Sequence, residues 1–186
     1  MIAAGFVRDF SLVVSPRFAS RERRVGDVTV RSWFASSRAA SGERVLDTAA
    51  RALALFTRRF GPYPYTELDV VEAPLVGGAG GMELSGLVTV ATMFYRPMRA
   101  GAGGLGQLLG AGGPDLEEHR LASLELVTAH EVAHQWWHGI VGSDSRRHPS
   151  RTSASRSTAP CSTSRSGTAR SARGARPTAR WRRATT

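Results

Sequence analysis

The residues with the clearest capacity for chemistry form the pattern H-E-x-x-H, at His130-Glu131-Val132-Ala133-His134. Residues four positions apart share one face of a helix, so the imidazoles of His130 and His134 can bind one zinc ion. Glu131 then lies beside the metal, where its carboxylate can accept a proton from the attacking water. A helix that carries two histidines by chance is the alternative. The setting of the pattern favours a metallohydrolase helix.

The helix that must carry this group is predicted to begin near Asp115, because Asp115 and Glu118 have the spacing of a capping box. Apolar residues then recur at helical spacing, at Leu121, Leu124 and Val127. We expect the helix to run through the H-E-x-x-H turn to His138 and to end at Gly139.

A second helix is predicted over Ser41–Phe60, because its apolar residues form one stripe: Leu46, Ala49, Ala50, Leu53 and Phe56. Ser41 or Gly42 could cap its start, and Gly61-Pro62 should end it. Such a stripe indicates core packing rather than a binding surface.

Strands are expected around these helices. Alternating or β-branched residues predict a hairpin over Arg21–Phe34, which turns at Gly26-Asp27. They also predict three further strands, over Gly5–Val14, Leu68–Ala73 and Leu87–Met93.

Two glycine-rich stretches interrupt the pattern. The first, residues 76–84, has no Lys-Ser/Thr after its glycines and opens no helix, which argues against a nucleotide site. Close approach of the backbone to a ligand or strand explains these glycines better. The second stretch, residues 100–113, is predicted to be a mobile loop.

The formal net charge of +10 is confined to the C-terminal part of the chain. Residues 1–144 carry 14 arginines against 15 acidic residues, whereas residues 145–186 carry 11 arginines and no acid. Residues 150–186 also contain no Leu, Ile, Val, Phe, Met or Tyr, so we predict that this tail is disordered. Its one large apolar residue, Trp181, provides little base stacking. Specific nucleic-acid binding is therefore not expected.

Length and apolar content limit the remaining classes. The chain has 186 residues, enough for one domain or slightly more, and 41% hydrophobic residues can form a core. It contains neither a membrane-spanning apolar run nor a signal-peptide pattern, which favours a cytoplasmic location. The single cysteine, Cys161, excludes an internal disulfide. Oligomeric state is left open.

Three segments together resemble the zinc aminopeptidases of the membrane-alanyl-aminopeptidase and leukotriene-hydrolase type, which are gluzincins. The segments are Phe60-Gly61-Pro62-Tyr63-Pro64-Tyr65, Gly80-Gly81-Met82-Glu83, and the H-E-x-x-H group followed by Gln135-Trp136-Trp137. Leu84 departs from the family's G-x-M-E-N motif. The resemblance covers roughly residues 1–149 and implies an α+β fold. Residues 1–36 would be the last strands of an N-terminal β-domain. Residues 37–149 would begin a thermolysin-like catalytic domain.

The resemblance also implies roles for individual residues. His130 and His134 would be zinc ligands, and Glu131 the general base. Glu83 would hold the free α-amino group of a peptide substrate, which makes the implied activity that of an aminopeptidase. The backbone of Gly80, Gly81 and Met82 would pair with the extended substrate.

The family's third zinc ligand is absent from the sequence. A glutamate is expected nineteen positions after His134, but Ser153 stands there and no glutamate follows Glu131. His138 and Asp144 are poorer substitutes. A reading frame shifted by two bases in a GC-rich gene would place a glutamate codon across Thr152 and Ser153. We therefore interpret residues 150–186 as the product of a frameshift.

Two functions follow from these observations. The first is a zinc-dependent aminopeptidase, with this chain an incomplete fragment of weak or no activity. The alternative is a non-enzymatic domain whose basic tail binds nucleic acid non-specifically through phosphate contacts.

Overall fold

The computed structural model describes residues 7, 9–77, 79–97, 114–137 and 139–141. These residues form a five-stranded mixed sheet in the order β1-β2-β3-β5-β4. The strands are β1 (Phe18–Val25), β2 (Val28–Ala35), β3 (Glu67–Ala73), β4 (Gly81–Leu84) and β5 (Leu87–Ala91). The outer pairs, β1–β2 and β4–β5, are antiparallel hairpins, whereas β2–β3 and β3–β5 are parallel.

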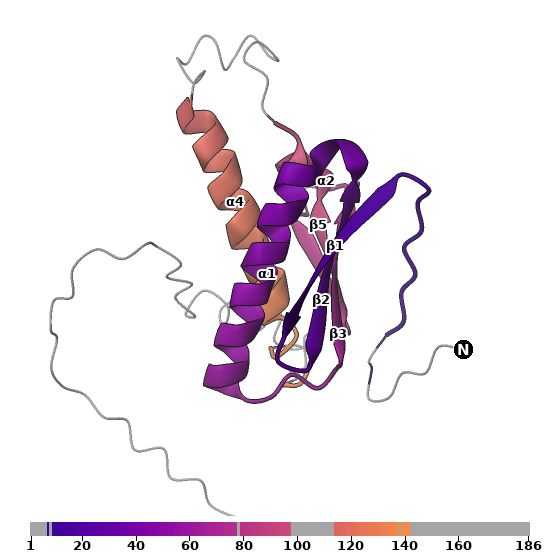
Figure 1. The fold of residues 1–186 in the computed structure, drawn as a ribbon, viewed down its shortest axis with the longest axis vertical. Helices are drawn as coiled ribbons and strands as arrows, with labels where there is room; N and C mark the ends of the chain where they lie inside the picture. The colour runs from indigo at the N-terminus through magenta and orange to yellow at the C-terminus, as the bar shows by residue number, and fades with distance from the viewer. Residues whose placement is uncertain (1–6, 8, 78, 98–113, 138, 142–186) are drawn as a thin grey trace, which may run out of the picture.

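Two long helices pack on one face of this sheet, as Figure 1 shows. The first, α1 (Ala39–Phe60), covers β1 and β2, and the second, α4 (Pro114–Ala133), covers β4 and β5 and packs beside α1. Short helices η1 (Ser36–Arg38) and α2 (Thr92–Tyr95) follow β2 and β5. The predicted α+β class is confirmed.

The predicted hairpin and first helix are confirmed. Gly26 has φ 60°, the left-handed conformation that a two-residue hairpin turn needs and that glycine adopts without a steric cost. All five residues of the predicted apolar stripe of α1 are buried. Gly61, at φ 109°, ends this helix and donates its N–H to the Thr57 carbonyl.

The predicted cap of α1 was wrong. The helix begins at Ala39, so Ser41 and Gly42 lie inside its first turn. The Ser41 hydroxyl instead donates to the Tyr95 carbonyl at 3.0 Å, and Gly42 packs against the Phe34 ring. Tertiary contacts with α2 and β2 therefore explain these two small residues better than capping does.

Side chains alternate across the sheet, and its helix-facing side forms the core. Val30, Leu68, Val70, Val88 and Val90 are all fully buried on that side. The register places Gly81 opposite Val90 and Glu83 opposite Val88, so both face the helices. The sheet thus directs one carboxylate of its edge strand β4 toward α4.

Two strand predictions need correction. The segment Leu87–Met93 is a strand only to Ala91, because Thr92 begins α2. The described part of Gly5–Val14 contains no strand. Its apolar side chains Phe10, Leu12 and Val14 are largely exposed. Alternation alone could not predict this outcome, because a strand also needs a partner with which to pair.

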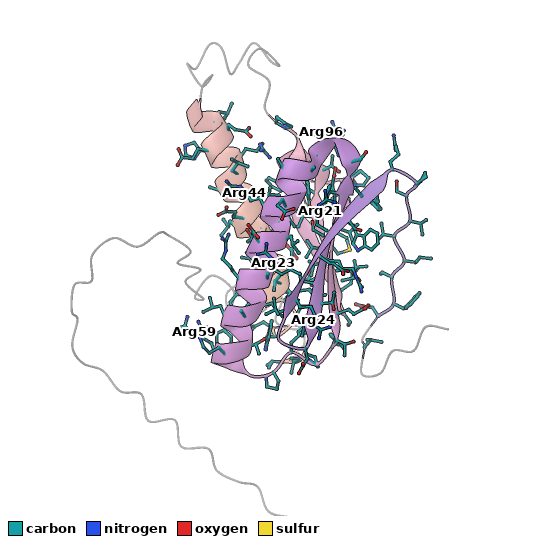
Figure 2. All side chains as sticks on the ribbon, viewed as in Figure 1. Arg21, Arg23, Arg24, Arg44, Arg59 and Arg96 are labelled. Atoms are coloured by element: carbon teal, nitrogen blue, oxygen red, sulfur yellow. The ribbon has the colours of Figure 1, made fainter. Side chains whose placement is uncertain are left out.

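Ion pairs join α1 to its neighbours on the surface. Arg23 of β1 pairs with Asp47 at 2.5 Å, and Arg44 pairs with Glu125 of α4 at 2.6 Å. Figure 2 shows Arg21, Arg23 and Arg24 along β1 and Arg44 on the side of α1 that faces α4. The groove between the two helices therefore carries charges of both signs rather than of one sign. None of the described helices combines the length and apolar character that a membrane crossing requires.

Candidate metal and peptidase site

The site lies where the end of α4 meets the edge strand β4. His130 and Glu131 occupy the last turn of α4, which ends at Ala133, five residues before the predicted end. His134 lies in the turn that follows, where three successive N–H groups bond three residues back at 3.1–3.2 Å. The helix tightens here because the side chains of Gln135 and Trp136 are held by neighbouring elements.

Glu83 of β4 reaches this turn. Its Oε1 atom lies 3.5 Å from Nδ1 of His134, and the rings of His130 and His134 lie 5.2 Å apart with planes at 80°. Candidate ligand atoms of Glu83, Glu131 and His134 all lie within 4.8 Å of one another. The structure therefore brings together one imidazole and two carboxylates from two separate segments.

Gly81 explains how Glu131 comes so near the strand. A Cβ atom at this position would lie 2.5 Å from the Cδ atom of Glu131, so only glycine leaves room for the carboxylate. Gly80 has no such restriction, since a Cβ atom there would make ordinary contacts with Val127 and Phe94 at 3.5–3.6 Å. The glycine-rich segment is therefore approached closely at Gly81, but by a glutamate side chain of α4 rather than by the ligand or strand that the sequence led us to expect.

Gln135 holds the β4–β5 turn against the end of α4. Its Nε2 donates to the Leu84 carbonyl at 2.8 Å, and its Oε1 accepts from the Gly86 N–H at 3.0 Å. The Tyr63 hydroxyl lies 3.4 Å from this Oε1 atom and 3.2 Å from the Glu67 carbonyl, and its one hydrogen is shared between the two acceptors. Burial raises the pKa of Tyr63, so the phenol stays protonated as a donor. These contacts fix the position of Glu83 relative to His134.

The tryptophan pair joins the same region to the end of α1. The Trp136 indole donates to the Gly61 carbonyl at 3.1 Å, and its ring lies 5.8 Å from Phe56 and 5.6 Å from Tyr63. Trp137 packs edge-on against Phe60 at 4.3 Å. Two of the three motif segments therefore form one aromatic cluster behind the histidines.

A small cavity of about 10 Å³ opens beside Glu83 and His134. Asp9 also lines it, and the Asp9 carboxylate accepts the Ser85 N–H at 2.9 Å. This volume suits one water-sized group rather than a substrate side chain. The N-terminal segment thus reaches the rim of the site, although the described part of it is not a strand.

Among the residues selected from the sequence, Glu83, Gly81, His130, Glu131 and His134 converge here. Met82 points to the opposite face of β4 and is 47% exposed. Gly80 extends the ladder, since its carbonyl accepts the Ala91 N–H at 2.9 Å. The predicted loop 100–113, the tail 150–186 and the residues His138, Asp144 and Ser153 lie outside the described residues.

Sequence reasoning missed the roles of Gln135 and Asp9. Gln135 stands directly after the second histidine, but its bonds join it to residues about fifty positions away, so no local pattern signals its role. Asp9 gave no signal either, because its approach to Ser85 depends on the path of an irregular segment.

Comparison with known proteins supports a distant relationship to an aminopeptidase. No family model matches the chain. Aminopeptidase M1-A of Oryza sativa subsp. japonica is 32% identical over 116 residues, a match that covers 60% of this chain. The chain spans only 11% of the length of that relative.

Proposed function

We propose that this chain is part of a zinc aminopeptidase of the membrane-alanyl-aminopeptidase and leukotriene-hydrolase type. The observation that carries the proposal is the convergence of Glu83 with Glu131 and His134. An exopeptidase needs one carboxylate to accept a proton from water and a second to hold the substrate ammonium. The aminopeptidase relative and the order of the three motifs support the same conclusion.

The donor set fits a divalent metal. The imidazole rings of His130 and His134 lie next to each other. The carboxylates of Glu131 and Glu83 lie on α4 and on β4, which face each other. In this proposal His130 and His134 would hold zinc, and the metal would supply polarisation of the substrate carbonyl and of a water molecule. Glu131 accepts the proton of the attacking water and passes it to the departing amine.

In this proposal, the edge strand β4 orients the peptide substrate. Its outer edge has no partner strand among the described residues, so an extended peptide can pair with the backbone of Gly80, Gly81 and Met82. Glu83, on the helix-facing side, then holds the peptide's free N-terminus. This arrangement restricts cleavage to the first peptide bond.

We also propose the domain division of residues 1–36, 37–149 and 150–186, with the thermolysin-like part second and a frameshifted tail third. In this view, the chain is an incomplete fragment of weak or no activity, because Ser153 stands where the third ligand is expected. The activity, substrates and partners of the whole protein are part of this proposal.

The test is hydrolysis of alanyl and leucyl 4-nitroanilides by the full chain with zinc added. We expect slow release that a chelator abolishes. The N-acetylated reporters are the control and should not be cleaved, since they lack the ammonium group. Hydrolysis that a chelator leaves unchanged, or equal cleavage of the acetylated reporters, would contradict the aminopeptidase proposal.

A further inference from the structure

An exposed segment, residues 9–14, precedes the sheet, and Figure 1 shows it on the side of the sheet opposite to α1 and α4. Its most exposed apolar side chains alternate along the chain, since Phe10 is 68% exposed, Leu12 73% and Val14 78%. Every second side chain of an extended segment lies on the same face. The segment therefore presents a stripe of three apolar side chains to solvent.

The backbone of this segment has no pairing partner within the described part of the chain. None of the backbone hydrogen bonds outside the helices and strands involves residues 10–14. The segment is joined to the β4–β5 turn through a side chain instead, because the Asp9 carboxylate accepts the Ser85 N–H at 2.9 Å. Residues 10–14 thus have the alternation of a strand together with donors and acceptors that a neighbouring strand could bind.

Charged side chains protect the outer edge of the sheet at β1 but not this segment. Four successive residues of β1 are charged, Arg21 to Arg24, and such charges disfavour pairing with another chain. Residues 10–14 are Phe-Ser-Leu-Val-Val and carry no charge. The segment is therefore open to strand pairing where β1 is not.

The charges at the two ends of the segment are complementary. Asp9 precedes it and Arg17, which is exposed, follows it closely. An antiparallel pair of two such segments places Asp9 of one copy at the Arg17 end of the other, whereas a parallel pair brings like charges together. Charge therefore favours the antiparallel pair.

The alternation selects the register of that pair. When Leu12 lies opposite its own counterpart in a second copy, Phe10 lies opposite Val14 at both ends, and all the apolar side chains share one face. This arrangement has two-fold symmetry, so a single segment supplies both surfaces of the contact. Pro16 has no N–H and limits the length of the pair.

We propose that residues 9–14 form an interface between two copies of this chain, which pair as antiparallel strands about Leu12. A pair this short buries little surface, so the dimer is weak and dissociates on dilution. The pairing is independent of the proposed aminopeptidase, because it uses none of the residues assigned to the metal or the substrate.

The first test is sedimentation equilibrium of the full chain over a range of concentrations. We expect a monomer–dimer equilibrium whose dissociation constant rises about tenfold or more in Leu12→Lys, because two like charges would then lie opposite each other at the symmetry axis. Leu126→Lys is the matched control, since Leu126 is 65% exposed on α4 and its replacement should leave the equilibrium unchanged. A wild-type chain that remains monomeric, or equal effects of the two variants, would overturn the proposal.

Thiol cross-linking tests the register, in a Cys161→Ser background. Leu12→Cys should form a disulfide-linked dimer on mild oxidation, because its two thiols face each other. Phe10→Cys alone should not, since its two thiols would lie about 13 Å apart along the strands. Mixed with Val14→Cys, it should cross-link. Cross-linking of Phe10→Cys with itself as readily as Leu12→Cys would overturn this register and the proposed interface.

Discussion

Gly81 lies directly against the side chain of Glu131, since a Cβ atom on residue 81 would lie 2.5 Å from the Glu131 carboxylate. The contacted atoms belong to the far end of a flexible side chain, so an added methyl group would displace the carboxylate rather than the backbone. The position of Glu131 therefore depends on the absence of a side chain across from it.

Gly81→Ala should thus impair the site without unfolding the chain. We expect reporter hydrolysis to slow by about tenfold or more, with a change in the free energy of unfolding within about 1 kcal/mol. Release of 4-nitroaniline and urea denaturation measure the two effects. Gly80→Ala is the matched control, because its methyl group would make only ordinary contacts. Equal losses of hydrolysis in both variants would show that the shape argument is wrong.

Gln135→Met should loosen the β4–β5 turn. Methionine matches the length of glutamine but cannot replace its bonds to Leu84 and Gly86, which leaves part-buried backbone groups unsatisfied. The expected loss is about 2 kcal/mol of unfolding free energy, together with weaker binding of the substrate's N-terminus as Glu83 moves. Ser123→Ala, which removes an exposed hydrogen bond on α4, should cost less than about 0.5 kcal/mol. Comparable losses in the two variants would count against the role of Gln135.

The sequence predicted those parts of the fold that local pattern determines. The stripe of α1, its stop at Gly61 and the hairpin at Gly26 depend on periodicity and on backbone preferences of nearby residues. The strand predicted at Gly5–Val14 failed because pairing depends on residues far away in the chain. The predicted end of α4 failed for a related reason, since Gln135 is held by β4 and the β4–β5 turn, and Trp136 by Gly61 at the end of α1.

The candidate site was predictable in part. The H-E-x-x-H pattern and the glycine-rich motif are enough to select the candidate histidines and carboxylates from the order of residues alone. Their mutual approach was not predictable, because it depends on the register that points Glu83 toward α4. The bonds made by Gln135 likewise join residues that lie about fifty positions apart in the chain, so no local pattern indicates them.

Asp69 should give the stability a distinct dependence on pH. Its carboxylate accepts the Trp33 indole N–H at 2.8 Å, yet burial dominates and raises the pKa of Asp69 in the folded state. Between the unfolded pKa of about 3.9 and the raised folded pKa, the folded state holds a proton that the unfolded state has lost. Stability contributed by this group is therefore full below that window and falls as the pH rises through it.

Asp69→Asn should remove this dependence while keeping an oxygen that accepts the indole N–H. We expect the difference in unfolding free energy between variant and wild type to favour the variant increasingly as the pH rises from about 3 to about 7, the range in which carboxyl groups titrate. Urea midpoints across this range measure it. A constant difference would mean that Asp69 titrates alike in both states.

The packing of Trp136 and its hydrogen bond should each contribute separately to the free energy of unfolding. Trp136→Phe keeps an aromatic ring against Phe56 and Tyr63 but removes the donor to the Gly61 carbonyl, so we expect a loss of about 1 kcal/mol. Trp136→Ala removes the packing as well and should cost about 3–5 kcal/mol. Thermal and urea unfolding measure both. If Trp136→Phe proved as damaging as Trp136→Ala, the contact with Gly61 would outweigh the aromatic cluster, contrary to this division.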